Sequence, residues 1–564
     1  MNWVIKENID NDFVNKLSNE LNISPILSSM LVKRDIKTFD QAKTFFRPNY
    51  EMLHDPFLMK DMSIAVKRIQ KALKEKESIM IFGDYDVDGT SSVALLSLYL
   101  ESLGLNVTKY LPDRKKEGYG ISLNAIDNAF NKKQKLIIAL DCGIKAHKQV
   151  DYAKEKGIEF IICDHHNPDK KIPQALAVLN PKRKDCEYPY KELCGCGVGF
   201  KLIQALETKQ SKDNQIINYL DLVALAIAAD VVPLTGENRI LAFIGLQIIN
   251  SNPKLGIHSL LKINPKKEYT ISDLMFYVGP RINAAGRIKH ASLALDLLMC
   301  NDVKSAEKLA VEIEELNTLR KEIERDITSQ AIDQVDNLKE NLNSIVVFDS
   351  DWNKGVIGIV ASRLVDKYYK PSVVFCESSK GFLTASARSI KGLDLYLVIN
   401  QCKEYIDQFG GHKYAAGLTI KKENLGAFKK RFESIVSQII DNNVFEQELL
   451  IESKISLNEI TPKFFRILKQ FEPFGPGNKS PLFLSENIRL KGKPFELGKE
   501  KEHIKLNLTQ DNKTSYSSVG FWFSNKFNNL ENKENFSAVF NIDENNWNGV
   551  KSTQLKLLDI KNND

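Results

Sequence analysis

The first strong pattern along the chain is a short apolar run that ends in alternating carboxylates. Residues 79–82 are apolar, and Asp84, Asp86 and Asp88 follow at every second position. Such a run predicts a buried strand. Side chains two residues apart in an extended chain point the same way, so these like charges would crowd together unless a cation lies among them. Carboxylate oxygens suit hard divalent cations such as Mg²⁺ and Mn²⁺.

Similar runs recur over residues 60–235, where they alternate with segments of helical spacing. Helices are predicted over residues 64–74, 91–103 and 146–156, and further strands over residues 136–141, 159–163 and 175–180. This alternation predicts a parallel α/β sheet, which binds ligands at the carboxyl ends of its strands. The polar residues at these ends are Asp84, Asp86, Asp88, Asp141, Asp164, His165 and His166. Asp230 follows nine mostly apolar residues and would mark a fourth strand end.

Two other interpretations of the acidic stretch are weaker. Asp-x-Asp-x-Asp-Gly also begins an EF-hand calcium loop, but that loop follows a helix and needs a glutamate where this chain has Leu95. A solvated acidic turn would not explain why several strand ends carry ligands. Cys194 and Cys196 do not have the spacing of a zinc knuckle.

The rest of the chain predicts four further regions. Residues 1–45 indicate a helical lead-in, and residues 302–338 one long amphipathic helix that connects two domains, with a coiled-coil seam as the alternative. A second α/β unit follows. From residue 450, short strands with interleaved lysines and aromatics predict an OB-type β-barrel that binds single strands; a plain β-module is the alternative. The predicted domains are residues 1–45, 46–300, 301–342, 343–445 and 450–564.

Length and composition narrow the class of protein. A chain of 564 residues exceeds one hydrophobic core, and 43% hydrophobic with 27% charged residues is typical of globular proteins. The net charge of +6 does not by itself indicate a polyanionic partner. We find no apolar run of membrane-spanning length and no signal peptide, so we expect a cytoplasmic protein with reduced cysteines.

The candidate ligands suffice for two divalent ions that share a bridging carboxylate. Two such ions activate water and stabilise both oxygens of an in-line phosphoryl displacement. Asp141 stands alone after its strand and is the candidate bridge, and the histidines shift the preference from Mg²⁺ toward Mn²⁺. Arginines bind phosphate well, and the candidates are Arg114, Arg281, Arg287 and Arg388.

The ordered motifs resemble those of the DHH phosphoesterase family. These motifs are residues 84–89, Asp141-Cys-Gly, Asp164-His165-His166, Asp230 and Gly410-Gly411-His412. Residues 278–287, the long helix and the β-domain are similar to those of the single-strand-specific 5′→3′ exonucleases within that family. The resemblance implies a DHH domain, a DHH-associated domain and an OB fold, with Mn²⁺ or Mg²⁺ at the cleft between the first two.

The resemblance also implies roles for individual residues. The implied metal ligands are Asp86, Asp88, Asp141, His165 and Asp230. The implied catalytic residues are Asp84 and His166, which line the metal site, and His412, which reaches the scissile phosphate. The implied pocket for a terminal 5′ phosphate consists of Arg114, Arg281, Ser386 and Arg388.

The activity implied by the resemblance is 5′→3′ digestion of single-stranded DNA to mononucleotides in DNA repair and recombination. A helicase and a single-strand-binding protein are implied partners, and a monomer is expected. One alternative is a smaller DHH enzyme that cleaves short oligonucleotides, which would lack residues 450–564. Another is a non-catalytic single-strand binder, which would not need carboxylates that repel phosphate.

Overall fold

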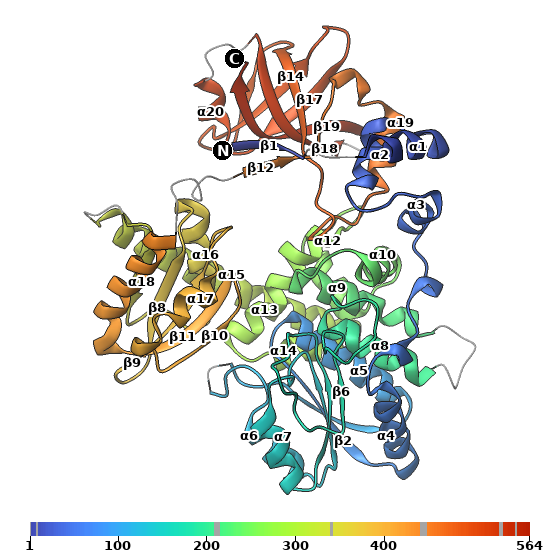
Figure 1. Cartoon of the computed structure of the whole chain (residues 1–564), viewed down its shortest axis with the longest axis vertical. Coiled ribbons are helices and arrows are strands. Elements are labelled where there is room, and N and C mark those ends of the chain that lie inside the picture. The colour runs from blue at the N-terminus through green and yellow to red at the C-terminus, as the bar shows by residue number, and fades with distance from the viewer. Residues whose placement is uncertain are drawn as a thin grey trace. The chain divides into compact units, whose positions relative to one another are not determined.

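A computed structural model describes residues 2–6, 10–114, 116–207, 215–338, 342–439, 448–529, 534–547 and 550–563 (Figure 1). Contacts divide the chain into two compact units. The larger unit is Asn49–Glu446, and the smaller unit combines Met1–Pro48 with Gln447–Asp564.

The first half of the larger unit is built on a parallel five-stranded sheet of order β3-β2-β4-β5-β6. Its strands are β2 (Ser78–Gly83), β3 (Asn106–Tyr110), β4 (Leu136–Leu140), β5 (Glu159–Cys163) and β6 (Ala177–Leu179). The predicted parallel sheet is confirmed. No apolar run predicts β3, because this edge strand is partly exposed along its length.

Helices cover both faces of this sheet. They are α6 (Leu123–Asn131) and α7 (His147–Glu155) on one face, and α4 (Met62–Glu75), α5 (Val87–Ser102) and α8 (Gly195–Glu207) on the other. Alternate residues of β2 show the two cores, since Met80 and Phe82 pack with α6 and α7 while Ile79 and Ile81 pack with the second group. Burial on both faces explains the uninterrupted apolar runs of the central strands.

A helical region follows the sheet. It contains α9 (Leu220–Asp230), α10 (Gly236–Ser251), α11 (Leu255–Lys262), α12 (Ile271–Asp273), a π-helical turn (Leu274–Val278), α13 (Gly279–Ile288) and α14 (Ser292–Leu298). The expectation that Asp230 marks a strand end is wrong, because this residue ends a buried helix. An apolar run alone does not distinguish a buried helix from a buried strand.

The predicted long helix is α15 (Val303–Asp336), which has 34 residues and spans about 50 Å. It begins where the Asp302 side chain accepts a hydrogen bond from the Ser305 N–H. Its first part packs on α11, α13 and α14, and its last part packs on α16 (Ile357–Tyr368) and β7 (Ile345–Asp349). Neither α15 nor any other described helix is long and apolar enough to cross a membrane.

The second half of the larger unit has a mixed sheet of order β10-β11-β9-β8-β7. Its other strands are β8 (Ser372–Ser379), β9 (Phe382–Arg388), β10 (Gln408–Gly411) and β11 (Ala415–Lys421), and its other helices are the short α17 (Leu395–Asn400) and the longer α18 (Leu425–Ile439). Val373 and Phe375 of β8 pack with α17 and α18, whereas Val374 and Cys376 pack with α15 and α16. The predicted second α/β unit is therefore present.

The smaller unit contains a closed β-barrel. From residue 448 onward this unit contains the strands β12 (Glu448–Ile451), β13 (Ser453–Lys454), β14 (Phe483–Leu490), β15 (Phe495–Leu497), β16 (His503–Thr509), β17 (Ser515–Gly520), β18 (Phe536–Trp547) and β19 (Val550–Asn562). It also contains the helices α19 (Pro462–Lys469) and α20 (Ser524–Asn528). The ring β14-β18-β19-β17-β16 closes because β16 also pairs with β14. Five strands in a closed ring agree with the predicted OB fold.

The N-terminal segment contributes to the core of this barrel. It contains β1 (Asn2–Ile5), α1 (Asn11–Leu21), α2 (Pro25–Val32) and α3 (Phe39–Phe46). Strand β1 pairs in parallel with β12, and the Trp3 Nε1–H donates a hydrogen bond of 2.9 Å to Asp559. Leu17 and Leu31 share one hydrophobic cluster with Phe471 and Phe483. These contacts join residues more than 400 positions apart, so no local pattern in the sequence indicates them.

Leu31→Ala should therefore destabilise the barrel as well as α2. Leu31 has no exposed surface, and losing such a side chain from a core costs about 2–5 kcal/mol. We expect faster hydrogen exchange in β14 and β18 and unchanged exchange in β4. Leu319→Ala, at a side chain that is 43% exposed, is the control. Unchanged exchange in the barrel strands would contradict a shared core.

Candidate active site

The carboxyl ends of β2, β4 and β5 lie side by side and bring the predicted ligands together. Three overlapping groups have candidate ligand atoms within 4.8 Å of one another. They are Asp84 with Asp86 and Asp141, Asp141 with His165 and His166, and Asp88 with His165 and Asp230. Asp141 and His165 each belong to two groups, and Asp141 is the better placed to be shared, because a carboxylate has two oxygen atoms whereas a neutral imidazole offers one lone pair.

The acidic motif turns directly from a strand into a helix. Asp86 caps α5, since its Oδ1 accepts a hydrogen bond of 3.0 Å from the Gly89 N–H. A Cβ on Gly89 would lie 2.4 Å from the Asp84 carbonyl oxygen, so only glycine lets the helix start against the strand end. Asp88 therefore lies in the first helical turn. The expectation of one extended backbone through all three carboxylates is wrong for this residue.

Asp88 also accepts two backbone hydrogen bonds. The Gly195 and Cys196 N–H groups at the start of α8 each donate a bond of 2.7 Å to its carboxylate. Each carboxylate oxygen has a second lone pair, so these bonds leave capacity for a cation. They fix the orientation of the carboxylate before any ligand arrives.

Asp141 has an unusual backbone conformation. Its φ is +60°, which is uncommon for a residue other than glycine and costs of order 1–3 kcal/mol. Its N–H donates a hydrogen bond of 2.9 Å to the Cys163 carbonyl oxygen, and a Cβ on Gly195 would lie 2.6 Å from its own Cβ. The surrounding packing thus holds Asp141 in place, as is typical of residues at functional sites.

Burial and mutual repulsion dominate the electrostatics of the cluster. Burial raises the pKa of Asp141 well above its usual value, and the charges of Asp88 and Asp86 raise it further. Burial, with Asp86 as the next cause, raises the pKa of Asp88 to about 7. Burial also lowers the pKa of His165 to about 3, so this imidazole is neutral and offers a lone pair. The cluster therefore concentrates carboxylates, and the described cationic side chains offset this only in part, Arg114 and His166 at Asp84 and Lys182 at Asp230.

The unpaired atoms of the cluster fit a divalent metal. Among the described residues, Asp84 Oδ1, Asp230 Oδ2 and both ring nitrogens of His165 are buried and lack a hydrogen-bond partner. His165 Nε2 lies 3.2 Å from Asp141 Oδ1, 3.6 Å from Asp230 Oδ2 and 3.9 Å from Asp88 Oδ2. Leaving such atoms unpaired is costly, whereas a cation among them would satisfy them together. Carboxylate oxygens with an imidazole nitrogen suit Mn²⁺.

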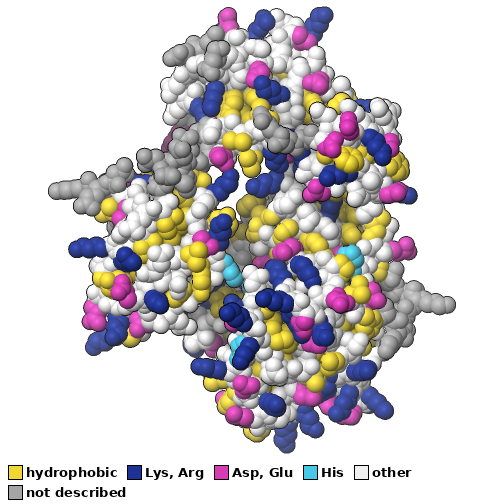
Figure 2. Space-filling view, in the orientation of Figure 1, with side chains coloured by type: hydrophobic (Ala, Val, Ile, Leu, Met, Phe, Trp, Pro, Cys, Tyr) yellow, Lys and Arg dark blue, Asp and Glu magenta, His cyan; other side chains and the backbone are white. Residues whose placement is uncertain are grey.

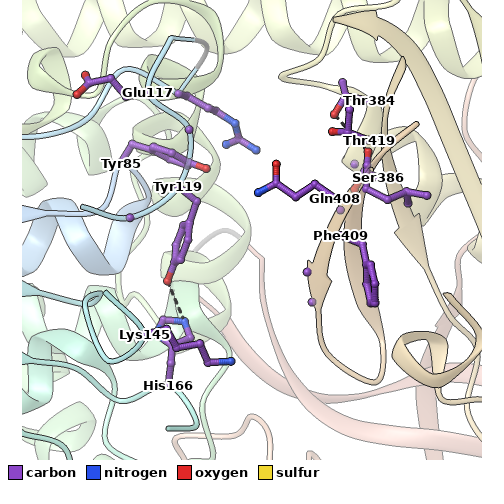
Figure 3. Close-up of a pocket in the computed structure, with 18 of the residues that line it drawn as sticks. Tyr85, Glu117, Tyr119, Lys145, His166, Thr384, Ser386, Gln408, Phe409 and Thr419 are labelled. Atoms are coloured by element: carbon purple, nitrogen blue, oxygen red, sulfur yellow. Dashed lines mark hydrogen bonds between the residues drawn. The ribbon is translucent and has the colours of Figure 1, made fainter. Parts of the chain in front are cut away.

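Asp164 orients His166 and does not join the three groups. Its Oδ1 accepts hydrogen bonds from the His166 N–H at 3.0 Å and from the ring Nδ1–H at 2.8 Å. Although burial opposes it, the hydrogen bond from His166 holds the pKa of Asp164 at about 2. Burial alone would lower the pKa of His166, but Asp164 raises it. His166 Nε2 remains available and lies 3.3 Å from the Tyr119 hydroxyl (Figure 3).

A cavity of about 920 Å³ adjoins this cluster, between the two halves of the larger unit. Figure 3 shows Tyr85, Tyr119 and His166 from the first half facing Ser386 and Gln408 from the second. Lys and Arg side chains gather around a hollow in the larger unit (Figure 2). The volume falls within the range of small-molecule sites.

Three arginines line this cavity, and none forms an ion pair with a described carboxylate. Arg114 lies 4.8 Å above the Tyr85 ring, and Arg388 Nη1 donates a hydrogen bond of 2.9 Å to Ser386 Oγ. Arg287 Nη1 donates a bond of 2.8 Å to the Gly355 carbonyl oxygen. Burial and repulsion from Arg114 lower the pKa of Arg287 to about 9, and the same two causes lower that of Arg388. This cluster would be stabilised by an anion.

The structure does not bring Arg281 to the cavity, contrary to the expected pocket. Arg281 Nη1 donates a hydrogen bond of 2.7 Å to the Tyr277 carbonyl oxygen, and Nη2 donates one of 3.1 Å to Glu314. Its guanidinium thus links α13 to α15. Arg287 lies six residues further along α13 and points about 120° away from Arg281 around the helix. The sequence makes both arginines candidates for phosphate binding, and only the residues around each one in the fold show that Arg287 is the one that lines the cavity.

His412 approaches the cluster from the second half. It follows β10, and its ring lies 6.5 Å from the His166 ring in a nearly parallel orientation of 15°. Gly411 has φ +152°, and a Cβ there would lie 2.4 Å from the Ala415 carbonyl oxygen, so the hairpin requires glycine. Burial, followed by repulsion from His166, lowers the pKa of His412.

Sequence reasoning missed several residues of the cavity wall. Tyr85 directly follows Asp84, and Tyr119 lies five residues after Arg114, so their closeness in sequence to candidate site residues could have indicated them. Gln408 and Phe409 precede the paired glycines, but nothing in a short strand indicates which residues face a ligand.

Family comparisons agree with this architecture. Residues 78–227 match "DHH family, N-terminal domain", residues 341–438 match "DHHA1 domain" and residues 451–559 match "RecJ OB domain". The fold and its strand-end cluster therefore define a DHH-family protein, as the motifs suggest. The chain belongs, more narrowly, to the RecJ family.

Individual relatives support this assignment. The single-stranded-DNA-specific exonuclease RecJ of Bacillus subtilis is 36% identical over 99% of this chain and 70% of the relative. The Haemophilus influenzae protein of the same name is 35% identical over 87% of this chain and 88% of its own. The crystal structure of Thermus thermophilus RecJ in complex with Mn²⁺ has a TM-score of 0.86 and 26% identity, covering 100% of this chain and 80% of that one. An exonuclease RecJ bound to manganese has a TM-score of 0.60 and 31% identity, covering 69% and 97% of the two chains.

Mn²⁺ affinity should rise between pH 6 and pH 8. Burial raises the pKa of Asp88 to about 7 and raises that of Asp141 as well, so protons compete with the metal for these carboxyls. Binding should therefore release protons, which calorimetric titrations in two buffers of different ionisation enthalpy can count. Asp366→Asn, at a side chain that is 72% exposed, should behave like the wild type. Affinity that does not change with pH would contradict this account of the cluster.

Proposed function

We propose that this chain is a metal-dependent exonuclease that degrades single-stranded DNA from its 5′ end to mononucleotides. The observation that carries the proposal is the cluster of unpaired carboxylate and imidazole atoms beside an arginine-lined cavity. Relatives named single-stranded-DNA-specific exonuclease and a related structure that contains Mn²⁺ support it.

The proposed metal ligands are Asp86, Asp88, Asp141, His165 and Asp230, with Asp84 beside them. Asp141 would be shared between two ions, because it belongs to two of the three ligand groups and its carboxylate has an oxygen atom for each ion. Two divalent ions in such a site activate a water molecule and stabilise the charge on the phosphoryl oxygens. The protein's part is to hold the carboxylates in fixed positions, which the backbone bonds to Asp88 and the packing around Asp141 achieve.

His166 and His412 would contact the phosphate that is cleaved. Asp164 fixes the Nδ1 proton of His166, so Nε2 faces the cavity beside the Tyr119 hydroxyl. His412 lies on the opposite wall with its ring parallel to that of His166. A phosphodiester along the edges of the two rings, where their N–H groups lie, would accept hydrogen bonds from both halves of the unit.

The proposed 5′-phosphate pocket consists of Arg114, Ser386 and Arg388, together with Arg287. A terminal phosphate carries more negative charge than an internal diester, so a cluster of guanidinium groups distinguishes the two. The Arg388 bond to Ser386 and the stacking of Arg114 on Tyr85 orient these groups before the strand binds. An enzyme that holds the end in this pocket would release short products from that end.

Other aspects of the function remain predictions. These are the helicase and single-strand-binding partners, the monomeric state, the cytoplasmic location and the role in DNA repair and recombination. A 5′-labelled single strand incubated with the protein and Mn²⁺ tests the main proposal. Labelled mononucleotide should appear first, and a matching blunt duplex should stay intact. Internal fragments, or no cleavage at all, would contradict the proposal.

Asp141→Asn should lower Mn²⁺-dependent digestion by about two orders of magnitude or more, because it removes one charge from a shared ligand. Asparagine keeps the size of the side chain and tolerates the positive φ of this position. Initial rates on a 5′-phosphorylated strand measure the effect, and circular dichroism checks the fold. A folded variant with near wild-type rates would exclude Asp141 as a shared ligand.

Arg388→Ala should cost about 10- to 100-fold in rate on a 5′-phosphorylated strand, the value of one or two charged hydrogen bonds. A strand with a 5′-hydroxyl should lose much less, so the ratio of the two rates should shrink. Arg325→Ala, at a side chain that is 79% exposed on α15, is the control. An unchanged ratio would mean that Arg388 does not bind the end of the strand.

A further inference from the structure

One buried side chain, Asn238, joins two loops that lead to the strand-end cluster. Asn238 lies in the first turn of α10 and has no exposed surface. Its Nδ2 donates a hydrogen bond of 2.5 Å to the Glu192 carbonyl oxygen and one of 3.0 Å to the Pro233 carbonyl oxygen. A single amide group therefore holds the backbones of both loops.

The loop that contains Glu192 leads to the groups that hold Asp88. Glu192 lies three residues before Gly195, at the start of α8. The Gly195 and Cys196 N–H groups donate one hydrogen bond to each oxygen of the Asp88 carboxylate. A shift of this loop would move both donors and turn the carboxylate with them.

The loop that contains Pro233 begins at Asp230. Asp230 is the last residue of α9, and the chain turns away at Val231, where φ is +59°. Asp230 Oδ2 is buried and has no hydrogen-bond partner among the described residues, so its position depends on the backbone that carries it. The Tyr190 hydroxyl donates a second hydrogen bond, of 3.1 Å, to the Pro233 carbonyl oxygen.

The start of α10 is itself held in place. The Glu237 carboxylate is buried and accepts hydrogen bonds of 3.2 Å from Lys201 Nζ, on α8, and of 2.6 Å from the Tyr188 hydroxyl. Asn238 Oδ1 is buried without a partner among the described residues, a cost that an apolar side chain would avoid. The benefit of an amide at this position therefore lies in its two donated bonds.

Two ligand groups of the cluster share no residue: the Asp88 group, which is Asp88, His165 and Asp230, and the Asp84 group, which is Asp84, Asp86 and Asp141. We propose that Asn238 is a positioning residue that fixes the spacing of Asp88 and Asp230, and through them one of the two metal positions. The inference rests on the proposed function and adds a residue that touches no metal. Both hydrogen bonds of Asn238 reach loops of the Asp88 group, so its loss should affect that position and spare the other.

The test measures Mn²⁺ binding to the full chain by calorimetric titration and by electron paramagnetic resonance. Asn238→Leu keeps a side chain of similar size and removes both donors. The affinity of one site should fall about 10- to 100-fold, as is typical when a residue that orients metal ligands is lost, while the other site keeps its affinity. At a Mn²⁺ concentration between the two affinities, the spectrum should change from that of a coupled pair to that of a single ion. Excess Mn²⁺ should restore the digestion rate.

Asn250→Leu is the matched control, because Asn250 Nδ2 also donates hydrogen bonds to two backbone carbonyl oxygens, those of Leu246 and Tyr269. Asn250 lies at the opposite end of α10, so this variant should bind both ions like the wild type. Tyr190→Phe removes only the second donor to the Pro233 carbonyl oxygen and should weaken the same site by a few-fold.

Wild-type affinity at both sites in a folded Asn238→Leu variant would overturn the inference. So would an equal loss at both sites together with a lower Tm, which would limit Asn238 to a role in stability. If Asn238→Leu does not fold, unchanged Mn²⁺ affinity in Tyr190→Phe would overturn it. The wild type tests the proposed function separately. If it binds two ions and digests single strands while the variants behave like it, only the positioning role is wrong. If it binds no pair of ions and digests nothing, the proposed function fails.

Discussion

The structure depends on the crowding of carboxylates at the edge of a parallel sheet. Parallel strands end at the same edge, so the residues after β2 and β4 cannot avoid one another. Burial and mutual repulsion raise the pKa of Asp141, and the conformation of this residue is itself strained. A bound ligand would offset the repulsion between these carboxylates and the strain at Asp141. Divalent cations are the ligands that these oxygen and nitrogen atoms suit.

The remaining architecture positions phosphate against this cluster. The long helix α15 packs on both halves of the larger unit, and Arg287 links them through the Gly355 carbonyl oxygen. The acidic cluster, Arg114 and Arg287 thus belong to the first half, while Ser386, Arg388 and His412 come from the second. Candidate metal ligands beside guanidinium groups from both halves suit a substrate that carries phosphate and needs metal ions to be cleaved. Arg114 lies beside both the phosphate pocket and the acidic cluster, because it stacks on Tyr85, the residue between Asp84 and Asp86 in the sequence.

Much of the fold could be predicted from hydrophobic pattern, because strands buried on both faces leave continuous apolar runs and α15 leaves a long amphipathic one. The hydrophobic pattern did not predict the structure correctly where the tertiary surroundings of a residue determine it. Asp230 ends a helix rather than a strand, since a helix surrounded by protein is apolar all round. Arg281 and Arg287 share one helix and differ only in what each faces. The packing of residues 1–48 on the barrel depends on contacts between the two ends of the chain, which a single sequence does not reveal.

The central claim is that Asp141 is shared by two divalent ions at the strand ends. Anomalous diffraction from crystals of the protein grown with Mn²⁺ tests it directly. The account predicts two manganese peaks in the strand-end cluster, a few ångströms apart, with an oxygen of Asp141 coordinated to each. A single peak, or two peaks of which one does not contact Asp141, would contradict it.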